Sequence, residues 1–222
     1  GSNLEFDING MRMDVITPWG SGILRCGLLG RFNSSNLLAA LATLCVSGLP
    51  FEEAVRRLAE TRTVPGRMER FDIGSDRPLV VVDYAHTAGA LEAVLKSLRV
   101  HCDGKLWCVF GAGGDRDKGK RSLMGAVAER YADMVVLTND NPRTEDPQSI
   151  IDDISAGLKQ PGSVHVETDR GKAIAHALQT AAPGDIVLIA GKGHEAVQII
   201  GNKALPFSDR ERVMALAREW KK

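Results

Sequence analysis

The chain has 222 residues, and its 28 basic and 28 acidic side chains give a formal net charge of zero. A chain without net charge has no overall attraction for DNA, RNA or an acidic membrane surface, so we expect none of these partners. No apolar run reaches the ~18 residues of a membrane-spanning helix, and the four cysteines have neither CxxC nor zinc-finger spacing. We therefore predict a globular protein of the reducing cytoplasm without a metal site of its own.

The residues before about 65 predict a small mixed segment. Strands are expected at 11–15 and 23–28, around the turn-rich stretch 17–22, and helices at 34–47 and 50–61. This is too little chain to bury a core of its own. We therefore expect residues 1–65 to be the end of another domain, joined to the rest by a linker at 64–66.

From residue 66 onward, apolar runs alternate with amphipathic segments. Strands are predicted at 79–84, 106–110, 134–137, 164–166 and 185–190, with helices at 87–100, before 131, at 146–158 and at 171–180. A hairpin at 198–207 and a helix at 209–220, capped by Ser208, complete the pattern. This alternation predicts an α/β, Rossmann-like fold, in which a mostly parallel sheet has helices on both faces. Ligands bind such sheets beyond the carboxyl ends of the strands.

A glycine-rich loop, residues 111–121, follows the second of these apolar strands and opens a helix. Backbone N–H groups and the helix dipole favour an anion at such a place. The stretch 114–120 fits the start of a P-loop, but Arg121 stands where the motif requires Ser or Thr to hold magnesium. We predict a carboxylate or phosphate site that uses Arg116, Lys118 and backbone amides. A solvated charged loop is the alternative.

Charged and amide side chains also follow the strands that end at Leu137 and Ala190. In the segment 140–143, DNPR, proline stiffens a turn, the arginine offers a planar fork for a carboxylate, and the aspartate can receive an ammonium. In the segment 191–195, GKGHE, the glycines allow close approach and Glu195 is a second partner for an ammonium. Taken alone, the first segment is a simple Asn-Pro turn. Because these loops leave one edge of the sheet with opposite charges, together they predict a site for a zwitterionic small molecule beside an anion site.

The segment after the first apolar strand is Asp83-Tyr84-Ala85-His86-Thr87. Asp83 and His86 lie beyond a strand end, where they could hold a nucleotide, a metal or each other. Thr87 has a second interpretation as the N-cap of the following helix. The residue types leave these alternatives open.

Several runs of residues resemble the Mur ligase family, in the order in which the family has them. They are GRFNSSNLLAALA (30–42), PGRMERF (65–71), VVDYAHT (81–87), KLWCVFGAGGDRDKGKR (105–121), DNPRTEDP (140–147), GKGHE (191–195) and FSDRE (207–211). They cover nearly the whole chain from Gly30 onward. DNPR is the most specific run, because it is associated with the members that add diaminopimelate, whereas lysine-adding members usually differ there. Ala88 and Ser34 are minor departures from the family pattern.

The resemblance implies a three-domain enzyme with UDP-binding, central ATP-binding and carboxy-terminal Rossmann-like domains. It assigns residues 1–65 to the tail of the central domain and residues 66–222 to the carboxy-terminal domain. The family's P-loop and magnesium ligands would lie upstream. ATP and Mg²⁺ are therefore implied for the parent enzyme, and a fragment of this extent is expected to be inactive alone. The implied parent is a cytoplasmic, monomeric ligase of peptidoglycan biosynthesis that forms an amide bond through an acyl phosphate.

The resemblance also implies roles for individual residues, by motif position. The site for meso-diaminopimelate would consist of Arg116, Asp140, Asn141, Arg143, Gly191 and Glu195. The ATP side would include Asn33, Asn36, Arg67, Asp83, His86 and Lys118. No catalytic residue and no metal ligand is assigned to this chain. The other implied partners are UDP-N-acetylmuramoyl-L-alanyl-D-glutamate, ATP and the missing domains of the same polypeptide.

Three alternatives stay open at this point. The first is another Mur-type or folylpolyglutamate-type ligase with the same fold. The second is a non-catalytic nucleotide-binding module built on the Walker-like loop. The third is a domain that serves only as a scaffold or binds only a protein partner.

Overall fold

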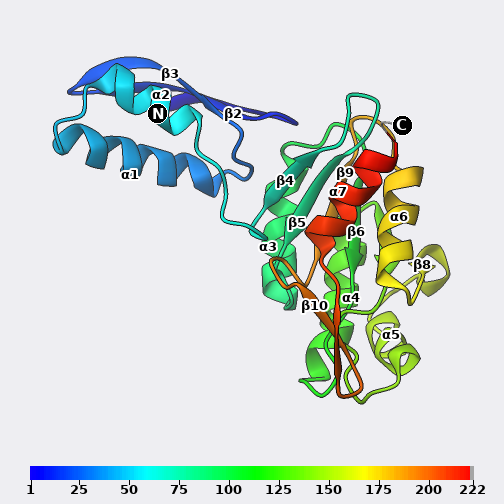
Figure 1. Cartoon of the computed structure of the whole chain (residues 1–222). Coiled ribbons are helices and arrows are strands. Elements are labelled where there is room, and N and C mark those ends of the chain that lie inside the picture. The colour runs from blue at the N-terminus through cyan, green and yellow to red at the C-terminus, as the bar shows by residue number, and fades with distance from the viewer. Residues whose placement is uncertain (221–222) are drawn as a thin grey trace. The chain divides into compact units, whose positions relative to one another are not determined.

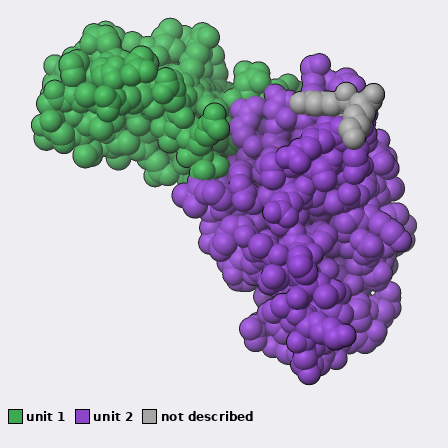
Figure 2. Space-filling view, in the orientation of Figure 1, with its two compact units in different colours: residues 1–63, 97–103 green, residues 64–96, 104–222 purple. Residues whose placement is uncertain are grey.

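The computed structural model describes residues 1–220, which divide into two compact units (Figures 1 and 2). Unit 1 comprises residues 1–63 and 97–103, and unit 2 comprises residues 64–96 and the chain from 104 onward. The division between Thr63 and Val64 falls at the predicted linker. No helix within the described 220 residues combines the length and the apolar character that crossing a membrane requires.

Unit 1 is a three-stranded antiparallel sheet with two helices (Figure 1). Its elements are β1 (Ser2–Asp7), β2 (Gly10–Thr17), β3 (Gly20–Cys26), α1 (Phe32–Val46) and α2 (Phe51–Ala59). Buried side chains such as Met13, Leu24 and Leu41 form one apolar cluster. The expectation that this segment has no core of its own is therefore wrong. One reason is strand β1, which was not predicted and which packs Leu4 and Phe6 against that cluster.

The sheet of unit 2 has six strands in the order β4-β5-β9-β6-β7-β8. Its strands are β4 (Glu69–Asp72), β5 (Leu79–Asp83), β6 (Leu106–Phe110), β7 (Met134–Leu137), β8 (His165–Val166) and β9 (Ile186–Ala190). All neighbours pair in parallel except β4, which is antiparallel to β5 at the edge. The predicted α/β fold is confirmed. The polar strand β4, Glu-Arg-Phe-Asp, lacks the apolar run of a central strand and was missed.

Right-handed crossovers fix which helices of unit 2 cover which face of the sheet. The helices are α3 (Ala88–Arg99), α4 (Gly119–Tyr131), α5 (Pro147–Ser155), α6 (Arg170–Thr180) and α7 (Asp209–Glu219), with a 3₁₀ turn at Pro161–Ser163. The connections through α3, α4 and α5 all advance across the sheet towards β8, which places these helices on one face. The connection through α6 runs back to β9 and lies on the other face, where α6 contacts β6, β7 and β9 and packs against α7 (Figure 1).

Alternate side chains of the strands face the layer formed by α6 and α7. Val80, Val82 and Trp107 belong to the same buried cluster as Ile174 of α6 and Val213 of α7. The predicted cap of the last helix is confirmed, because Ser208 Oγ accepts the N–H of Glu211 at 3.4 Å. The predicted hairpin is also present and consists of β10 (Val197–Ile200) and β11 (Lys203–Pro206).

The parallel strands bring four loops to one edge of the sheet. Asp83, at the end of β5, is in register with Ala190 at the end of β9, and Phe110 of β6 is in register with Leu137 of β7. The segments after these strands therefore emerge side by side, as the sequence predicted. This carboxyl edge is where the candidate site lies.

Candidate functional site

The loops after β6 and β7 are held together at the carboxyl edge by hydrogen bonds between their backbones and side chains. Gly114 N donates to Asn141 O at 2.9 Å, and Arg143 Nη1 donates to Gly114 O at 2.7 Å. Thr144 Oγ1 donates to Asp115 Oδ1 at 2.8 Å. Asp115 and Arg143 both have left-handed backbone conformations, with φ of 52° and 53°. The two loops, residues 111–118 and 140–145, thus form one preorganised surface, which we call the ledge.

Two of the predicted arginines flank a glycine on this ledge. A Cβ atom added to Gly113 would lie 3.0 Å from Arg143 Nη1 and 3.5 Å from Arg116 Cγ. Arg116 is exposed and Arg143 is half-buried. The two arginine side chains therefore lie against the backbone of Gly113, and the planar fork of a guanidinium group is suited to a carboxylate.

The loop after β9 places acidic side chains beside this basic ledge. Asp140 is 7% exposed, and its Oδ2 would lie 2.8 Å from a Cβ atom at Gly191, whose φ is 117°. Asn141 Nδ2 donates to Glu195 Oε2 at 3.1 Å. The structure therefore gathers Asp140, Asn141 and Glu195, from two loops, into one cluster. Only glycine at position 191 permits this approach without strain.

The two carboxylates of the cluster are in different electrostatic states. Burial raises the pKa of Asp140, although Arg170 and Lys192 oppose the rise. Partial burial would also raise the pKa of Glu195, but hydrogen bonds from Lys192 and Asn141 outweigh it and lower that pKa. Of the two carboxyl groups, Glu195 is therefore the one whose ionised form is favoured near neutral pH. A cationic group of a ligand would strengthen the ionised form of both.

Arg121 explains why the glycine-rich loop is not a P-loop. Its side chain is fully buried, and its guanidinium donates to Glu145, to Asp153 and to Gly113 O at 2.8–3.1 Å. In a P-loop the corresponding side chain would reach a metal ion beside the phosphates. Here it is turned inward and fixes the loop to the segment around Glu145.

The ion pair of Arg121 with Glu145 predicts a pH-dependent contribution to stability. Hydrogen bonds from Arg121 lower the pKa of Glu145 from 4.5 to about 2. A depressed carboxyl pKa stabilises the folded state above about pH 4.5, and this stabilisation is lost as the pH falls towards 2. Urea unfolding of the wild type and of E145Q at several pH values checks this. We expect the difference between their unfolding free energies to shrink as the pH falls from 5 to 2; a constant difference would contradict the assignment.

The residues predicted for the ATP side are distributed over both units. Within unit 1, Asn33 Nδ2 donates to Leu29 O at 2.8 Å and Asn36 Nδ2 donates to Asn33 Oδ1 at 3.0 Å, so the two amides adjoin on α1. Within unit 2, Arg67 stacks over the ring of Tyr84, 4.5 Å from its centroid. Their role on the ATP side stays a prediction.

Asp83 and His86 do not bind each other, which the sequence had left open. The Asp83 carboxylate accepts the N–H groups of Met68 and Ala85 at 2.7 and 2.8 Å, and His86 Nδ1 lies 2.8 Å from Tyr84 O. The alternative for Thr87 is confirmed, because its Oγ1 accepts the N–H of Ala90 at the start of α3.

Of the loop lysines, Lys120 rather than Lys118 lies beside His86. Lys120 Nζ donates to His86 O at 3.0 Å. Lys118 Nζ lies 3.3 Å from Glu145 Oε2 instead.

Sequence reasoning missed three buried cations that organise the edge. They are Arg121, Lys192 and Arg170. Arg170 donates to both carboxylate oxygens of Asp209 and to the carbonyls of Asn139 and Ala190, so it joins the ends of β7 and β9. The signal for Lys192 was its position inside GKGHE, but nothing in the sequence showed that its side chain points inward.

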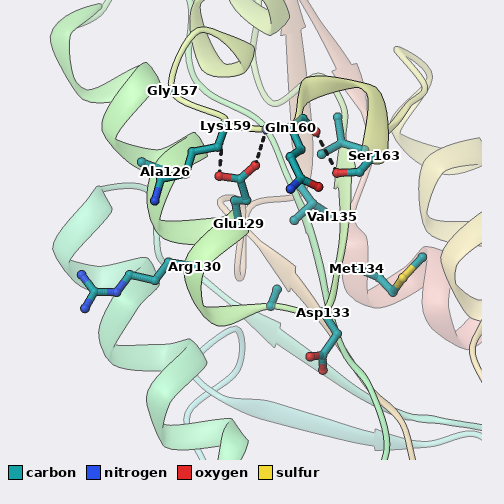
Figure 3. Close-up of a pocket in the computed structure, with 12 residues that line it drawn as sticks. Ala126, Glu129, Arg130, Asp133, Met134, Val135, Gly157, Lys159, Gln160 and Ser163 are labelled. Atoms are coloured by element: carbon teal, nitrogen blue, oxygen red, sulfur yellow. Dashed lines mark hydrogen bonds between the residues drawn. The ribbon is translucent and has the colours of Figure 1, made fainter.

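A cavity of about 960 Å³ in unit 2 lies elsewhere, and none of the predicted site residues line it. It surrounds the beginning of β7 at Asp133 and Met134, at the opposite edge of the sheet (Figure 3). There Glu129 accepts the N–H groups of Lys159 and Gln160 at 2.9 and 2.8 Å, so its charge is already satisfied (Figure 3). The carboxyl edge, where the predicted residues lie together, is the candidate site.

Residues 66–193 match the family described as Mur ligase, glutamate ligase domain, which is more than half of the chain. The chain belongs to the Mur ligase family. The matched residues run from the beginning of unit 2 to the loop after β9. They therefore include the carboxyl edge as far as Gly193, and Glu195 lies two residues beyond the match.

Among curated proteins, the chain is similar to UDP-N-acetylmuramoyl-L-alanyl-D-glutamate–2,6-diaminopimelate ligase of Coxiella burnetii. The identity is 55% over 202 residues, which are 91% of this chain and 41% of the relative. A solved structure of a ligase with the same description superposes with a TM-score of 0.85 at 40% identity and covers all of this chain and 45% of the other. This Mur ligase chain thus spans less than half the length of these relatives.

More distant structures share the fold. A folylpolyglutamate synthase of Thermotoga maritima superposes with a TM-score of 0.64 at 23% identity, over 85% of this chain and 42% of the other. At that identity the likeness supports the architecture and carries nothing about the ligand.

Proposed function

We propose that this chain is the carboxy-terminal part of an ATP-dependent ligase that adds meso-2,6-diaminopimelate to UDP-N-acetylmuramoyl-L-alanyl-D-glutamate during peptidoglycan biosynthesis. One observation carries the proposal. Two arginines, Arg116 and Arg143, and two acidic residues, Asp140 and Glu195, lie on neighbouring loops at one edge of the sheet. The 55% identity to a ligase of that description supports the same substrate.

The chemistry of diaminopimelate fits this arrangement. It carries a carboxylate and an ammonium group at each end. Arg116 and Arg143 on either side of Gly113 can receive a carboxylate, and Asp140 with Glu195 can receive an ammonium. L-Lysine lacks the distal carboxylate, so it would leave an arginine without its partner. That loss disfavours lysine.

The proposed reaction forms one amide bond. ATP transfers its γ-phosphoryl group to a carboxylate of the acceptor, which gives an acyl phosphate and ADP, and the neutral amino group of the incoming amino acid attacks the acyl carbon. A C–N bond forms, the C–O bond to phosphate breaks, the nitrogen loses a proton and inorganic phosphate leaves. The contribution of this chain is to hold and orient the amino acid, which is a large part of such catalysis.

We propose the ATP-dependent part of the reaction for the longer protein. We also propose that the longer protein is a monomer in the cytoplasm. Asn33, Asn36, Arg67, Asp83 and His86, with Lys118, are proposed on the ATP side. Residues 1–220 hold no group of three or more His, Cys, Asp or Glu side chains suited to a metal ion. We assign no Mg²⁺ ligand to this chain and derive no step through the ion. Residues 1–65 are proposed as the tail of the ATP-binding domain and 66–222 as the amino-acid domain.

A binding titration of the chain tests this proposal. The ¹⁵N-labelled chain is titrated with meso-2,6-diaminopimelate, L-lysine and L-glutamate and followed by NMR, which detects weak binding. We expect diaminopimelate to shift resonances of the loops 111–118, 140–145 and 191–195 and to bind at least ~10-fold more tightly than lysine. Equal binding of diaminopimelate and lysine, or a preference for glutamate, would refute it. ATP binding that is lost in K120A, without amino-acid binding, would favour a nucleotide-binding module.

A further inference from the structure

Lys192 lies in a tight turn directly after β9 and has a fully buried side chain. Gly191 and Gly193 on either side of it have φ of 117° and 54°. These left-handed conformations reverse the chain, so that the lysine between them points inward rather than into solvent. A buried ammonium is costly unless polar partners surround it. Its partners therefore indicate what the side chain is for.

All partners of the Lys192 ammonium belong to the proposed amino-acid site. Its Nζ lies 3.0 Å from Asn141 Oδ1, 3.0 Å from Glu195 Oε2 and 3.8 Å from Asp140 Oδ1. A lysine ammonium has three hydrogens to donate and accepts none. The three neighbours come from the loops after β7 and β9. The proposed site requires these two loops to keep a fixed relative position.

The ammonium decides which way the amide of Asn141 faces. Asn141 Oδ1 accepts both from Lys192 Nζ and from Ile199 N, the latter at 2.9 Å. Two donors occupy both lone pairs of this oxygen, so Nδ2 must face the other way, towards Glu195. Nδ2 carries two hydrogens, and Glu195 accepts one of them. The amide is therefore set to present a donor, which is what a ligand carboxylate requires.

The same ammonium balances the acidic side chains of the cluster. The Glu195 carboxylate interacts electrostatically with four charged groups, those of Lys192, Arg143, Arg170 and Asp140. Asn141 is its uncharged hydrogen-bond partner. Of these cations, Lys192 donates directly to its carboxylate. One Glu195 oxygen, Oε2, receives both Lys192 and Asn141. The pair of contacts to one oxygen fixes the carboxylate and leaves Oε1 to meet a ligand ammonium.

We propose that Lys192 is a positioning residue of the amino-acid site, which orients the Asn141 amide and the Glu195 carboxylate towards a ligand that carries both a carboxylate and an ammonium. The inference rests on the function proposed above and adds to it a residue that touches the ligand only through others. Its effect should therefore pass through Asn141 and Glu195.

The experiment compares the wild type with K192M, E195Q and the double variant K192M/E195Q. Methionine keeps the length of the side chain and removes its donors. We expect K192M to weaken the binding of meso-2,6-diaminopimelate by ~10-fold or more, the effect of losing about 1.4 kcal/mol. K192R keeps the positive charge and should restore part of the affinity. The effects of K192M and E195Q should be strongly non-additive, because both break the same contact.

A second measurement does not depend on the ligand. The pKa of Glu195, followed by ¹³C NMR of its carboxyl group, should be higher in K192M than in the wild type, because the hydrogen bond that lowers it is gone. A lysine that only filled space would not change this value. Should K192M fail to fold, K192R tests the same point with the charge retained: its Glu195 pKa should stay low, and a value as high as that of a free glutamate would count against the proposal.

The outcomes separate the two proposals. If the wild type binds diaminopimelate and K192M binds it equally well with an unchanged Glu195 pKa, the role of Lys192 is refuted and the proposed function stands. Additive effects of K192M and E195Q would likewise refute it. If the wild type does not bind diaminopimelate, the proposed function fails, whatever the Glu195 titration shows.

Discussion

Replacing Asp209 with asparagine is expected to destabilise unit 2 by about 3–5 kcal/mol. Asp209 and Arg170 are both fully buried and form a two-point ion pair, with distances of 2.7 and 2.8 Å. Removing the negative charge leaves the guanidinium of Arg170 buried without compensation. Since Arg170 also donates to Asn139 O and Ala190 O, the ends of β7 and β9 should loosen together.

Urea unfolding followed by tryptophan fluorescence measures this effect. Of the three tryptophans, Trp19 lies in unit 1, so a Trp19→Phe background leaves only Trp107 and Trp220, both in unit 2, as probes. The matched control is E219Q on the same helix. Glu219 is 61% exposed, and its carboxylate lies 3.9 Å from Arg212, so its loss should change stability by less than about 1 kcal/mol. Similar losses in D209N and E219Q would show that burial does not set the strength of these pairs.

Replacing Arg143 should remove most of the preference for diaminopimelate over lysine. We expect R143N to weaken diaminopimelate binding by ~10-fold to 100-fold, because a paired charge-assisted contact with a carboxylate is worth about 1.5–3 kcal/mol. Binding of L-lysine, which has no distal carboxylate, should change little. Asparagine is chosen because Arg143 has a φ of 53°, a conformation that asparagine tolerates better than alanine.

Two further measurements make the Arg143 result specific. R143K keeps the charge but not the planar fork, and it should bind diaminopimelate with intermediate affinity. Arg143 Nη1 also donates to Gly114 O, so the unfolding free energy of each variant must be measured alongside binding. An R143N chain that stays folded and still prefers diaminopimelate would assign the discrimination to another residue.

The central strands and helices of unit 2 could be predicted because their physical signal is local. β6 and β7 have the predicted bounds, Leu106–Phe110 and Met134–Leu137, since each is an unbroken apolar run buried on both faces. Strands β1 and β4 were missed for the opposite reason. Both lie at sheet edges and alternate or mix polar residues, and they become strands by pairing with β2 and β5. A short edge segment has little apolar pattern of its own, because its pairing with a neighbouring strand is what makes it a strand.

The loops of the candidate site were predictable in place but not in detail. Their position followed from the parallel sheet, because the carboxyl ends of β5, β6, β7 and β9 must share one edge. The side-chain orientations did not follow. Nothing local to residues 118–121 says that Arg121 turns inward to Glu145 or that Lys120 reaches His86.

The sequence by itself determined the parallel α/β fold, the edge at which charged loops gather and the resemblance of those loops to the Mur ligase family. Periodicity and motif order are properties of residues that are close in the sequence, so they can be recognised without the structure. Only the tertiary structure decided that Arg121 is an internal anchor, that Arg170 pairs with Asp209 thirty-nine positions away, and that Lys192 is buried between Asn141 and Glu195. A charged side chain can be buried only where a partner compensates the free-energy cost of removing it from water. That partner often comes from a distant segment, and only the fold brings it near.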